Sequence, residues 1–355
     1  MQSIEKLAAM LPSGVDAALV TSGHNRRYLT GFPSSAGMVL FTREAAWFLT
    51  DFRYIEAARR AVRGMECVEY SSLAETLPAM AARLGLHTVI VEDEGLSMAE
   101  YRRLSAMLPD VELKSGVLDG LLRECRLMKT PEELEKIKAA QALPEYGFEH
   151  ILPFIRPGRT EREVALELEF LIRNQGAEGV AFDFIVVSGA NSSLPHGVPG
   201  DKEIEPGDFV TMDFGARVDG WHSDMTRTVA VGSCSEEQRR VYDTVLRAQL
   251  AALSVLRAGL PCAEGDAAAR NVIRAAGYGD CFGHATGHGV GVEIHEEPRL
   301  SPRAGDEILR AGTVVTVEPG IYLPGRFGVR IEDMASITEE GCENLTKSPK
   351  ELRIL

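Results

Sequence analysis

The sequence predicts a protein of mixed α and β structure in two domains, an α/β domain over residues 1–125 and a larger α+β domain over residues 126–355. In the first 120 residues, short apolar runs alternate with helical patterns, as is typical of an α/β domain. The remainder twice presents helical patterns that are followed by strand patterns. A chain of 355 residues is also long enough for two domains that each bury a core of their own.

The N-terminal domain is predicted to have a mostly central sheet with helices between its strands. Residues 53–64 and 71–85 have helical patterns, and Gly85 is a typical residue at the C-terminal end of a helix. Residues 25–37 mix arginine, aromatic and small residues and are expected to form a loop. Four apolar runs predict strands, at residues 16–22, 37–42, 45–51 and 87–93.

Two helices are expected near the start of the C-terminal domain. Thr130 is suited to be an N-cap, and Pro131 is a favoured first helical residue. Thr160 and Glu163 predict a capping box for the second helix, which is expected to end at Gly176. One side of this second helix is apolar, through Val164, Leu168, Leu171 and Ile172.

The C-terminal domain is expected to contain an internal duplication. Its second half again begins with two helical patterns, and each half then supplies one pair of carboxylates among strand patterns. A chance alignment of a few residues is the alternative explanation. Three residues recur 101 positions later in the chain: Arg156 with Arg257, Gly158 with Gly259, and Gly176 with Gly277.

Composition restricts the partners and the compartment of the protein. A net charge of −14 argues against nucleic acid or an anionic membrane as the main partner. Six cysteines without CxxC spacing indicate free thiols in a reducing compartment. The first residues lack the apolar core of a secretory signal, and no stretch approaches 18 uninterrupted apolar residues. We therefore expect a cytoplasmic protein.

Five potential metal ligands, four carboxylates and one imidazole, lie in the C-terminal part of the chain. Each stands among apolar, β-branched or glycine residues, where an unpaired carboxylate is costly to bury. Carboxylates that converge in a fold repel one another unless cations lie between them. The set suits two divalent ions about 3.5–4 Å apart and therefore predicts metal-assisted hydrolysis. The ligands are Asp213, Asp224, His288, Glu318 and Glu332.

Local patterns predict how these ligands are placed. Asp213 ends an apolar strand, and a turn at residues 219–220 would return the chain so that Asp224 faces the same side. The glycines beside His288 are expected to let the backbone approach an ion closely. Glu318 is expected at the end of a strand and Glu332 inside one. Taken singly, turn aspartates, a core histidine or salt-bridged carboxylates would also explain these residues.

The segments around the ligands resemble a known family. MDFGA, SDMTRTVAVG, GHATGHGVGVEIHEEPRLSP, VTVEPGIYLPG and GVRIEDM look like motifs of the proline-specific dinuclear metallopeptidases, prolidase and aminopeptidase P, which have the pita-bread fold. The similarity covers roughly residues 125–350 and, more loosely, residues 15–60. Successive ligands are 11, 64, 30 and 14 residues apart, and five motifs in this order make the resemblance specific.

The resemblance implies a role for each ligand. Asp213 would bind one ion, Asp224 and Glu332 would bridge the two ions, and His288 and Glu318 would complete the other. Glu318 would also serve as the general base and later as the acid. The oxygen-rich ligand set admits manganese, cobalt or zinc.

Three histidines match positions at which the family contacts its substrate. His196 and His295 would contact the substrate and stabilise the oxyanion that develops in the transition state. His284, four residues before His288, would contact the substrate as well.

Two arginines complete the predicted site. Arg299 could pair with the free carboxylate of a dipeptide, although a surface arginine that balances Glu296 and Glu297 is an equal alternative. Arg330 is expected among the substrate-binding residues. It lies two residues before Glu332 and so on the same face of a regular strand, where it could orient that carboxylate.

The predicted activity is hydrolysis of the bond between an N-terminal residue and a following proline, as an Xaa-Pro aminopeptidase or an Xaa-Pro dipeptidase. The resemblance also implies a homodimer in which residues 1–120 help to enclose the active site, with residues 25–37 as a lid. A methionine aminopeptidase is one rival, but it would not need so large an N-terminal domain. A metal-free creatinase-like hydrolase and a non-catalytic pita-bread module that binds peptides or proteins are disfavoured because all five ligands are present.

Overall fold

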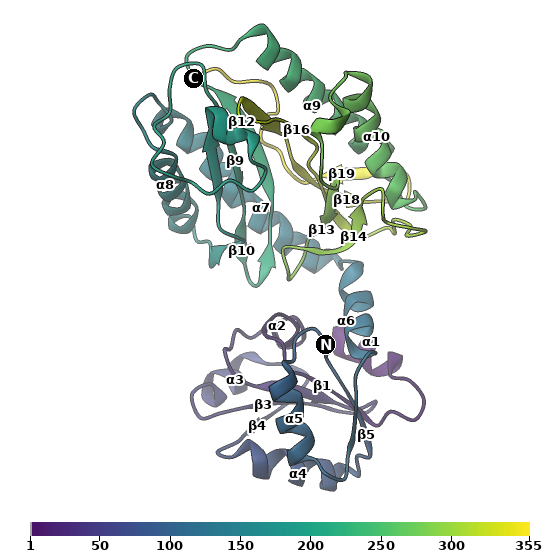
Figure 1. Ribbon diagram of the computed structural model, residues 1–355. Coiled ribbons are helices and arrows are strands. Elements are labelled where there is room, and N and C mark those ends of the chain that lie inside the picture. The colour runs from purple at the N-terminus through teal and green to yellow at the C-terminus, as the bar shows by residue number, and fades with distance from the viewer. Residues whose placement is uncertain (1) are drawn as a thin grey trace. The chain divides into compact units, whose positions relative to one another are not determined.

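The computed structural model describes residues 2–355, which divide into two compact units, one up to Arg126 and one from Leu127 to Leu355 (Figure 1). The N-terminal unit has one six-stranded sheet in the order β4-β3-β2-β1-β5-β6. β1 pairs antiparallel with β2 and parallel with β5, so the sheet is mixed. The elements of this unit are α1 (Gln2–Met10), β1 (Ala17–Val20), α2 (Gly23–Thr30), β2 (Met38–Phe41), β3 (Ala46–Thr50), α3 (Ile55–Ala61), β4 (Glu66–Glu69), α4 (Leu73–Leu84), β5 (Thr88–Val91), α5 (Met98–Met107), β6 (Glu112–Lys114) and α6 (Leu118–Leu127).

Apolar side chains cover both faces of this sheet. Successive strand residues point to opposite faces, so Val39 and Phe41 join one buried cluster whereas Leu40 joins the other. Helices α1, α3 and α6 contribute to the cluster of Val39 and Phe41, and helices α4 and α5 contribute to that of Leu40. The unit is therefore the α/β domain with a central sheet that the sequence predicts.

The helix α2 corrects one expectation for this unit. Residues 25–37 were expected to form a loop, but α2 covers the first part of this range. Its polar residues Asn25 and Arg26 are buried, and Asn25 Nδ2 donates a hydrogen bond of 2.8 Å to Glu92 Oε1. The helix is stabilised by a partner 67 residues away in the sequence, which no local pattern reveals.

The C-terminal unit consists of two halves, each with two helices followed by strands. In the first half, β8, β9 and β12 form one sheet and β7, β10 and β11 form another. Capping boxes at Thr130 and Glu133 and at Thr160 and Glu163 begin the two helices, as the sequence predicts for the second. The elements are α7 (Pro131–Ile151), α8 (Glu161–Asn174), β7 (Gly179–Val180), β8 (Ile185–Ser188), β9 (Phe209–Phe214), β10 (Ala216–Val218), β11 (Trp221–His222) and β12 (Met225–Ala230).

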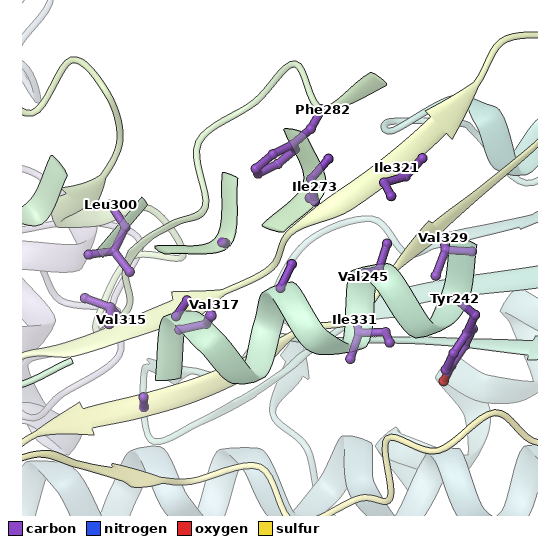
Figure 2. Packing of buried hydrophobic residues seen from close by; sticks show 14 of the residues in the cluster. Tyr242, Val245, Ile273, Phe282, Leu300, Val315, Val317, Ile321, Val329 and Ile331 are labelled. Carbon is purple, nitrogen blue, oxygen red and sulfur yellow. The ribbon is translucent and has the colours of Figure 1, made fainter. Parts of the chain in front are cut away.

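The second half has a larger sheet. Five strands lie in the order β14-β13-β15-β18-β19, and β16 and β17 form a separate hairpin. Helix α9 packs against both α10 and these strands, and Figure 2 shows Tyr242 and Val245 of α9 among the apolar side chains of the second half. The elements are α9 (Glu236–Val255), α10 (Cys262–Ala275), β13 (Gly287–Gly289), β14 (Glu296–Leu300), β15 (Val314–Val317), β16 (Gly320–Leu323), β17 (Phe327–Arg330), β18 (Asp333–Ile337) and β19 (Cys342–Asn344).

The repeated residues have the same local geometry in both halves, as a duplication predicts. Helices α8 and α10 both have 14 residues and begin 101 positions apart. Just before them, Gly158 and Gly259 have φ of 83° and 81°, which favour glycine. The Gly158 N–H donates to Ile204 O at 3.0 Å, and the Gly259 N–H donates to Leu309 O at 2.9 Å. An α+β unit made of two related halves agrees with the predicted pita-bread fold.

Within residues 2–355, none of the helices is both long enough and apolar enough to cross a membrane.

The core of the first half should depend strongly on Phe148 of α7. Phe148 is 1% exposed, so Phe148→Ala should lower the free energy of unfolding by about 3–5 kcal/mol through lost burial and a cavity. Phe170→Ala on α8 is the control, because Phe170 is 62% exposed and its loss should change stability by only about 0.5 kcal/mol. Urea unfolding followed by Trp221 fluorescence in a Trp47→Phe background would measure both. Equal effects of the two substitutions would contradict this assignment of the core.

Candidate active site

The first pair of carboxylates lies on the hairpin of β9 and β12. Asp213 of β9 pairs with Thr226 of β12, and Asp224 lies two residues before Thr226 and so shares its face. The chain between them turns at Asp219 and Gly220, which have φ of 50° and 83°. This is the turn that the sequence predicts, and it brings both carboxylates to one side of the hairpin.

The second pair lies between β15 and β18. These strands pair up to Val317 and Asp333, so that Glu318 and Glu332 are the next two residues beyond the register. Glu332 was expected inside a strand, but it lies between β17 and β18 and forms an isolated bridge with Thr226. This bridge crosses from one half of the unit to the other and joins the two carboxylate pairs.

His288 lies on the short strand β13 between Gly287 and Gly289. A Cβ atom at Gly287 would overlap the backbone oxygen of Thr316, and one at Gly289 would overlap that of Glu297. The two glycines are therefore required by neighbouring strand backbones, whereas the sequence suggested that they let the backbone approach an ion. The His288 Nδ1 atom lies 3.0 Å from Gly289 O, an arrangement that leaves Nε2 free to act as a ligand.

One pocket of about 610 Å³ in the C-terminal unit brings the predicted site together. Phe182, Phe184 and Ile294 add apolar side chains to its wall, and Asp183 adds a further carboxylate. All ten residues that the sequence nominated line this pocket, namely His196, Asp213, Asp224, His284, His288, His295, Arg299, Glu318, Arg330 and Glu332.

The predicted ligands approach one another closely in the pocket. One ligand atom each of Asp224, His288 and Glu332 lie within 4.8 Å of one another. His288 Nε2 is 3.6 Å from Asp224 Oδ2 and 3.4 Å from Glu318 Oε1. Residues from both halves of the unit thus converge within the coordination distance of a small cation and its ligands.

Arg330 contacts this group differently from what its spacing in the sequence suggests. It was expected to orient Glu332, but its Nη2 atom donates to Asp213 Oδ2 at 2.6 Å. Its remaining donors reach Thr226 Oγ1 at 3.1 Å, Tyr322 OH at 2.8 Å and Pro195 O at 3.2 Å, so Glu332 is linked only indirectly. Thr226 Oγ1 in turn donates to Glu332 Oε2 at 2.7 Å. The guanidinium group therefore holds one carboxylate directly and the other through a threonine.

Burial and mutual repulsion shift the protonation of these groups. Burial is the main cause that raises the pKa of Glu318 to about 8, and the charge of Asp213 acts in the same direction. Burial, together with neighbouring carboxylates, also holds the pKa values of Asp224 and Glu332 well above their ordinary range. Burial lowers the pKa of His288 to about 3, so its imidazole is neutral and suited to bind a metal ion.

Two carboxylate oxygens in this pocket lack the hydrogen bonds that a buried oxygen needs, which bears on whether a cation fits. Asp213 Oδ1 and Asp224 Oδ1 are buried, and neither atom accepts a hydrogen bond from any residue between 2 and 355. Buried carboxylate oxygens without donors are costly unless an ion satisfies them. Oxygen ligands with one imidazole suit divalent ions, so the donor set fits the predicted metal centre.

The pocket histidines differ in how they are held. His295 stacks edge-to-face on His288 with ring centroids 4.4 Å apart, and burial lowers its pKa. His284 uses both ring nitrogens, Nδ1 at 2.8 Å from Ala285 O and Nε2 at 2.9 Å from Tyr322 OH. Burial lowers the pKa of His284 to about 4. The His196 side chain is exposed to the pocket, and no group within residues 2–355 hydrogen-bonds its ring.

Arg299 lies at the pocket wall with an exposed side chain. Its Nε atom is 3.8 Å from Glu297 Oε1, a distance that leaves the guanidinium group available to a ligand. Glu296 does not balance Arg299, because its carboxylate forms a buried ion pair with Lys129 at 3.0 Å.

Several supporting residues were not nominated from the sequence. Thr226 and Tyr322 connect Arg330 to the ligands, and Thr316 Oγ1 donates to Glu318 Oε1 at 3.2 Å. Threonine and tyrosine are common in strands, so only their position within the quoted motifs could have identified them.

Family models, related sequences and solved structures all point to the same family of peptidases. The family model described as metallopeptidase family M24 matches residues 135–339, and that of the creatinase/prolidase N-terminal domain matches residues 4–128. An Xaa-Pro dipeptidase of Pyrococcus furiosus is 37% identical over 359 residues, which cover 99% of each chain. A solved Xaa-Pro dipeptidase from Bacillus anthracis is 46% identical with a TM-score of 0.96, over 100% of this chain and 99% of that one. A solved X-Pro aminopeptidase from Thermotoga maritima is 38% identical with a TM-score of 0.92, over 96% and 98% of the two chains.

Without cations, the stability of the protein should fall as the pH rises from about 6.5 to about 8. The pKa of Glu318, about 8, lies above its ordinary 4.5, so the folded state binds more protons than the unfolded state in this window. The pKa values of His288 and His284, about 3 and 4, lie below their ordinary 6.5. Their opposite effect fades early in this window, as the unfolded imidazoles lose their protons around pH 6.5, so the fall due to Glu318 outweighs it by pH 8.

Urea unfolding of chelated protein at a series of pH values would measure this dependence. Chelated Glu318→Gln is the control and should show a shallower fall, because its amide does not titrate. Stability that stays constant or rises between pH 6.5 and 8 in the chelated protein would contradict the assignment.

Proposed function

The chain belongs to metallopeptidase family M24 and is a metal-dependent Xaa-Pro peptidase, and we propose that it holds two divalent ions and prefers dipeptides. The convergence of four carboxylates and one imidazole in one pocket supports the metal-dependent chemistry. A peptide bond before proline is a tertiary amide without an N–H group, which proteases that bind an extended backbone handle poorly. The apolar wall around Phe182 and Ile294 offers a surface for the proline ring.

We assign the ligands as the resemblance implies. Asp213 would bind one ion, Asp224 and Glu332 would bridge the two, and His288 and Glu318 would complete the other. When bound, the ions lower the pKa of a water molecule and polarise the scissile carbonyl. Manganese, cobalt and zinc are all compatible with these ligands.

The remaining pocket residues act on the substrate in this proposal. Glu318 accepts the proton of the attacking water and passes it to the leaving nitrogen. His196 and His295 contact the substrate and donate to the developing oxyanion, which is where a fixed donor is most effective. His284 and Arg330 lie in the pocket wall, where His284 contacts the substrate and Arg330 orients Asp213 beside it.

Arg299 supports the preference for dipeptides. Hydrolysis of an Xaa-Pro dipeptide releases proline, whose carboxylate would lie on the leaving-group side of the scissile bond. An exposed arginine at the pocket wall can bind such a carboxylate with two parallel hydrogen bonds. A longer Xaa-Pro peptide places its carboxylate further away.

The rival activities have less support. A methionine-type aminopeptidase and a non-catalytic binding module are not favoured, because relatives that span the whole chain are named Xaa-Pro peptidases. We further propose a homodimer in the cytoplasm, with domains over residues 1–125 and 126–355. The six free cysteines are compatible with a reducing compartment.

Metal content should distinguish bridging from terminal ligands. Wild-type protein reloaded with manganese should hold two ions per chain and lose activity with a chelator. Asp224→Ala and Glu332→Ala remove proposed bridges and should empty both sites, whereas Asp213→Ala should empty chiefly one. Elemental analysis after dialysis would measure this, with Asp183→Ala, in the same pocket wall, as a control that keeps both ions. Full metal content in Asp224→Ala would contradict the ligand assignment.

A substrate panel tests the activity and the role of Arg299. The enzyme should cleave Xaa-Pro dipeptides faster than Xaa-Pro amides, Xaa-Pro-Yaa peptides or Met-Ala peptides. Arg299→Met should lower kcat/KM for the dipeptide by about 10–100-fold, since a hydrogen-bonded charge pair contributes about 1.5–3 kcal/mol. The amide lacks the carboxylate and should be nearly unaffected, and Arg303→Met is the control outside the pocket. Equal losses on dipeptide and amide would refute the carboxylate contact while leaving the peptidase activity intact.

A further inference from the structure

The loop that carries His196 is hydrogen-bonded at both of its ends to one residue of helix α8. This loop connects β8 to β9 and includes a short 3-10 turn, Gly189–Ser193, before it reaches Pro195 and His196. Since no described group hydrogen-bonds the His196 ring, the position of the imidazole depends on the loop backbone. The contacts that hold this backbone therefore also determine the position of the His196 imidazole relative to a substrate.

Glu161, the first residue of α8, binds both ends of this loop. Its Oε1 atom accepts hydrogen bonds from the Ser188 backbone N–H at 2.7 Å and from Ser188 Oγ at 3.0 Å. Its Oε2 atom accepts one from the Gly200 backbone N–H at 3.2 Å. Asn191 Nδ2, in the turn between, lies 3.1 Å and 3.3 Å from the two oxygens. One carboxylate thus joins the residues eight before and four after His196.

Burying the Glu161 carboxylate costs free energy unless hydrogen bonds compensate for its lost hydration. Its side chain is fully buried, and no lysine or arginine within residues 2–355 forms an ion pair with it. The N-terminal end of α8 favours a negative charge, but Thr160 and Glu163 already cap that end. A carboxylate that served only the helix would not point its oxygens into a loop. Its donors are Ser188, the last residue of β8, and two residues of the loop that carries His196.

We propose that Glu161 is a positioning residue that fixes His196 for catalysis. The proposal rests on the role assigned to His196 in the proposed function. The carboxylate accepts from donors at both ends of the loop, and only an acceptor with two oxygens can do so. Glu161→Gln keeps the shape of the side chain but replaces one acceptor by an amide donor, which would face an N–H group. One end of the loop would then be released.

The test compares Glu161→Gln, His196→Ala and the double variant, all loaded with manganese. Glu161→Gln should keep its metal content and KM for an Xaa-Pro dipeptide but lose about 10–100-fold in kcat, since a displacement of about 1 Å can cost about 10²-fold. The double variant should be no slower than His196→Ala, because Glu161 acts only through that histidine. Losses that multiply, or a loss of metal in Glu161→Gln, would overturn the proposal.

Two further variants make the result specific. Glu163→Gln on the same turn of α8 is the matched control, and it should lower the unfolding temperature without changing kcat. If Glu161→Gln does not fold, Asn191→Ala removes one loop donor and should lower kcat in the same non-additive way with His196→Ala. An Asn191→Ala variant with normal kcat would then overturn the proposal. Full activity of His196→Ala would instead refute the role of His196 itself and so the proposed function at that residue.

Discussion

The repulsion among four carboxylates, two of them buried and two half-buried, is the constraint on which the C-terminal unit depends. Asp213 and Asp224 come from one half, Glu318 and Glu332 from the other, and all four line the same pocket. Separately, each would be more stable in water or beside a cation. The fold brings them together by register: Asp213 pairs with Thr226 in the first half, Glu318 and Glu332 lie just beyond the pairing of β15 with β18 in the second, and the bridge of Thr226 with Glu332 joins the halves. Function at this site therefore requires a backbone rigid enough to resist the repulsion.

The two halves share their helices and strands, but they hold their pocket segments with acids at different positions. Glu161, the first residue of α8, binds the loop of His196. The equivalent position of α10 is a cysteine, and Asp266, four residues further along, accepts hydrogen bonds from the Thr286 backbone and hydroxyl instead. Arg270 then connects Asp266 to His284 O at 2.8 Å. In each half, a buried acid on the second helix thus accepts hydrogen bonds from the segment that carries pocket histidines, but from a different position of that helix.

Features that depend on residues close in the sequence are predicted correctly, whereas contacts between distant residues are not. The capping box of Thr160 and Glu163 is local and is predicted correctly, and residue type together with motif context identifies ten residues that line one pocket. The strands β4 and β6 were missed because they are short and mostly exposed and lack a clear apolar pattern. Strand spacing predicts Glu332 as the partner of Arg330, and this prediction is wrong because β17 ends at Arg330 and Glu332 belongs to a separate bridge. No local pattern contains the partner of a side chain that is 117 residues away.

The scaffold beneath the ligands explains how the protein can keep the site before any cation binds. Arg227 is fully buried beside Glu332, where it donates to Glu332 O at 2.6 Å and to Asp333 Oδ1 at 2.8 Å. Asp333 also accepts from Gln249 and Lys350, so its charge is compensated by the protein alone. The backbone that presents Glu332 is therefore held by an ion pair that needs no metal. The repulsion that remains among the ligand carboxylates is then relieved by cations, and this relief adds to the affinity with which the site binds them.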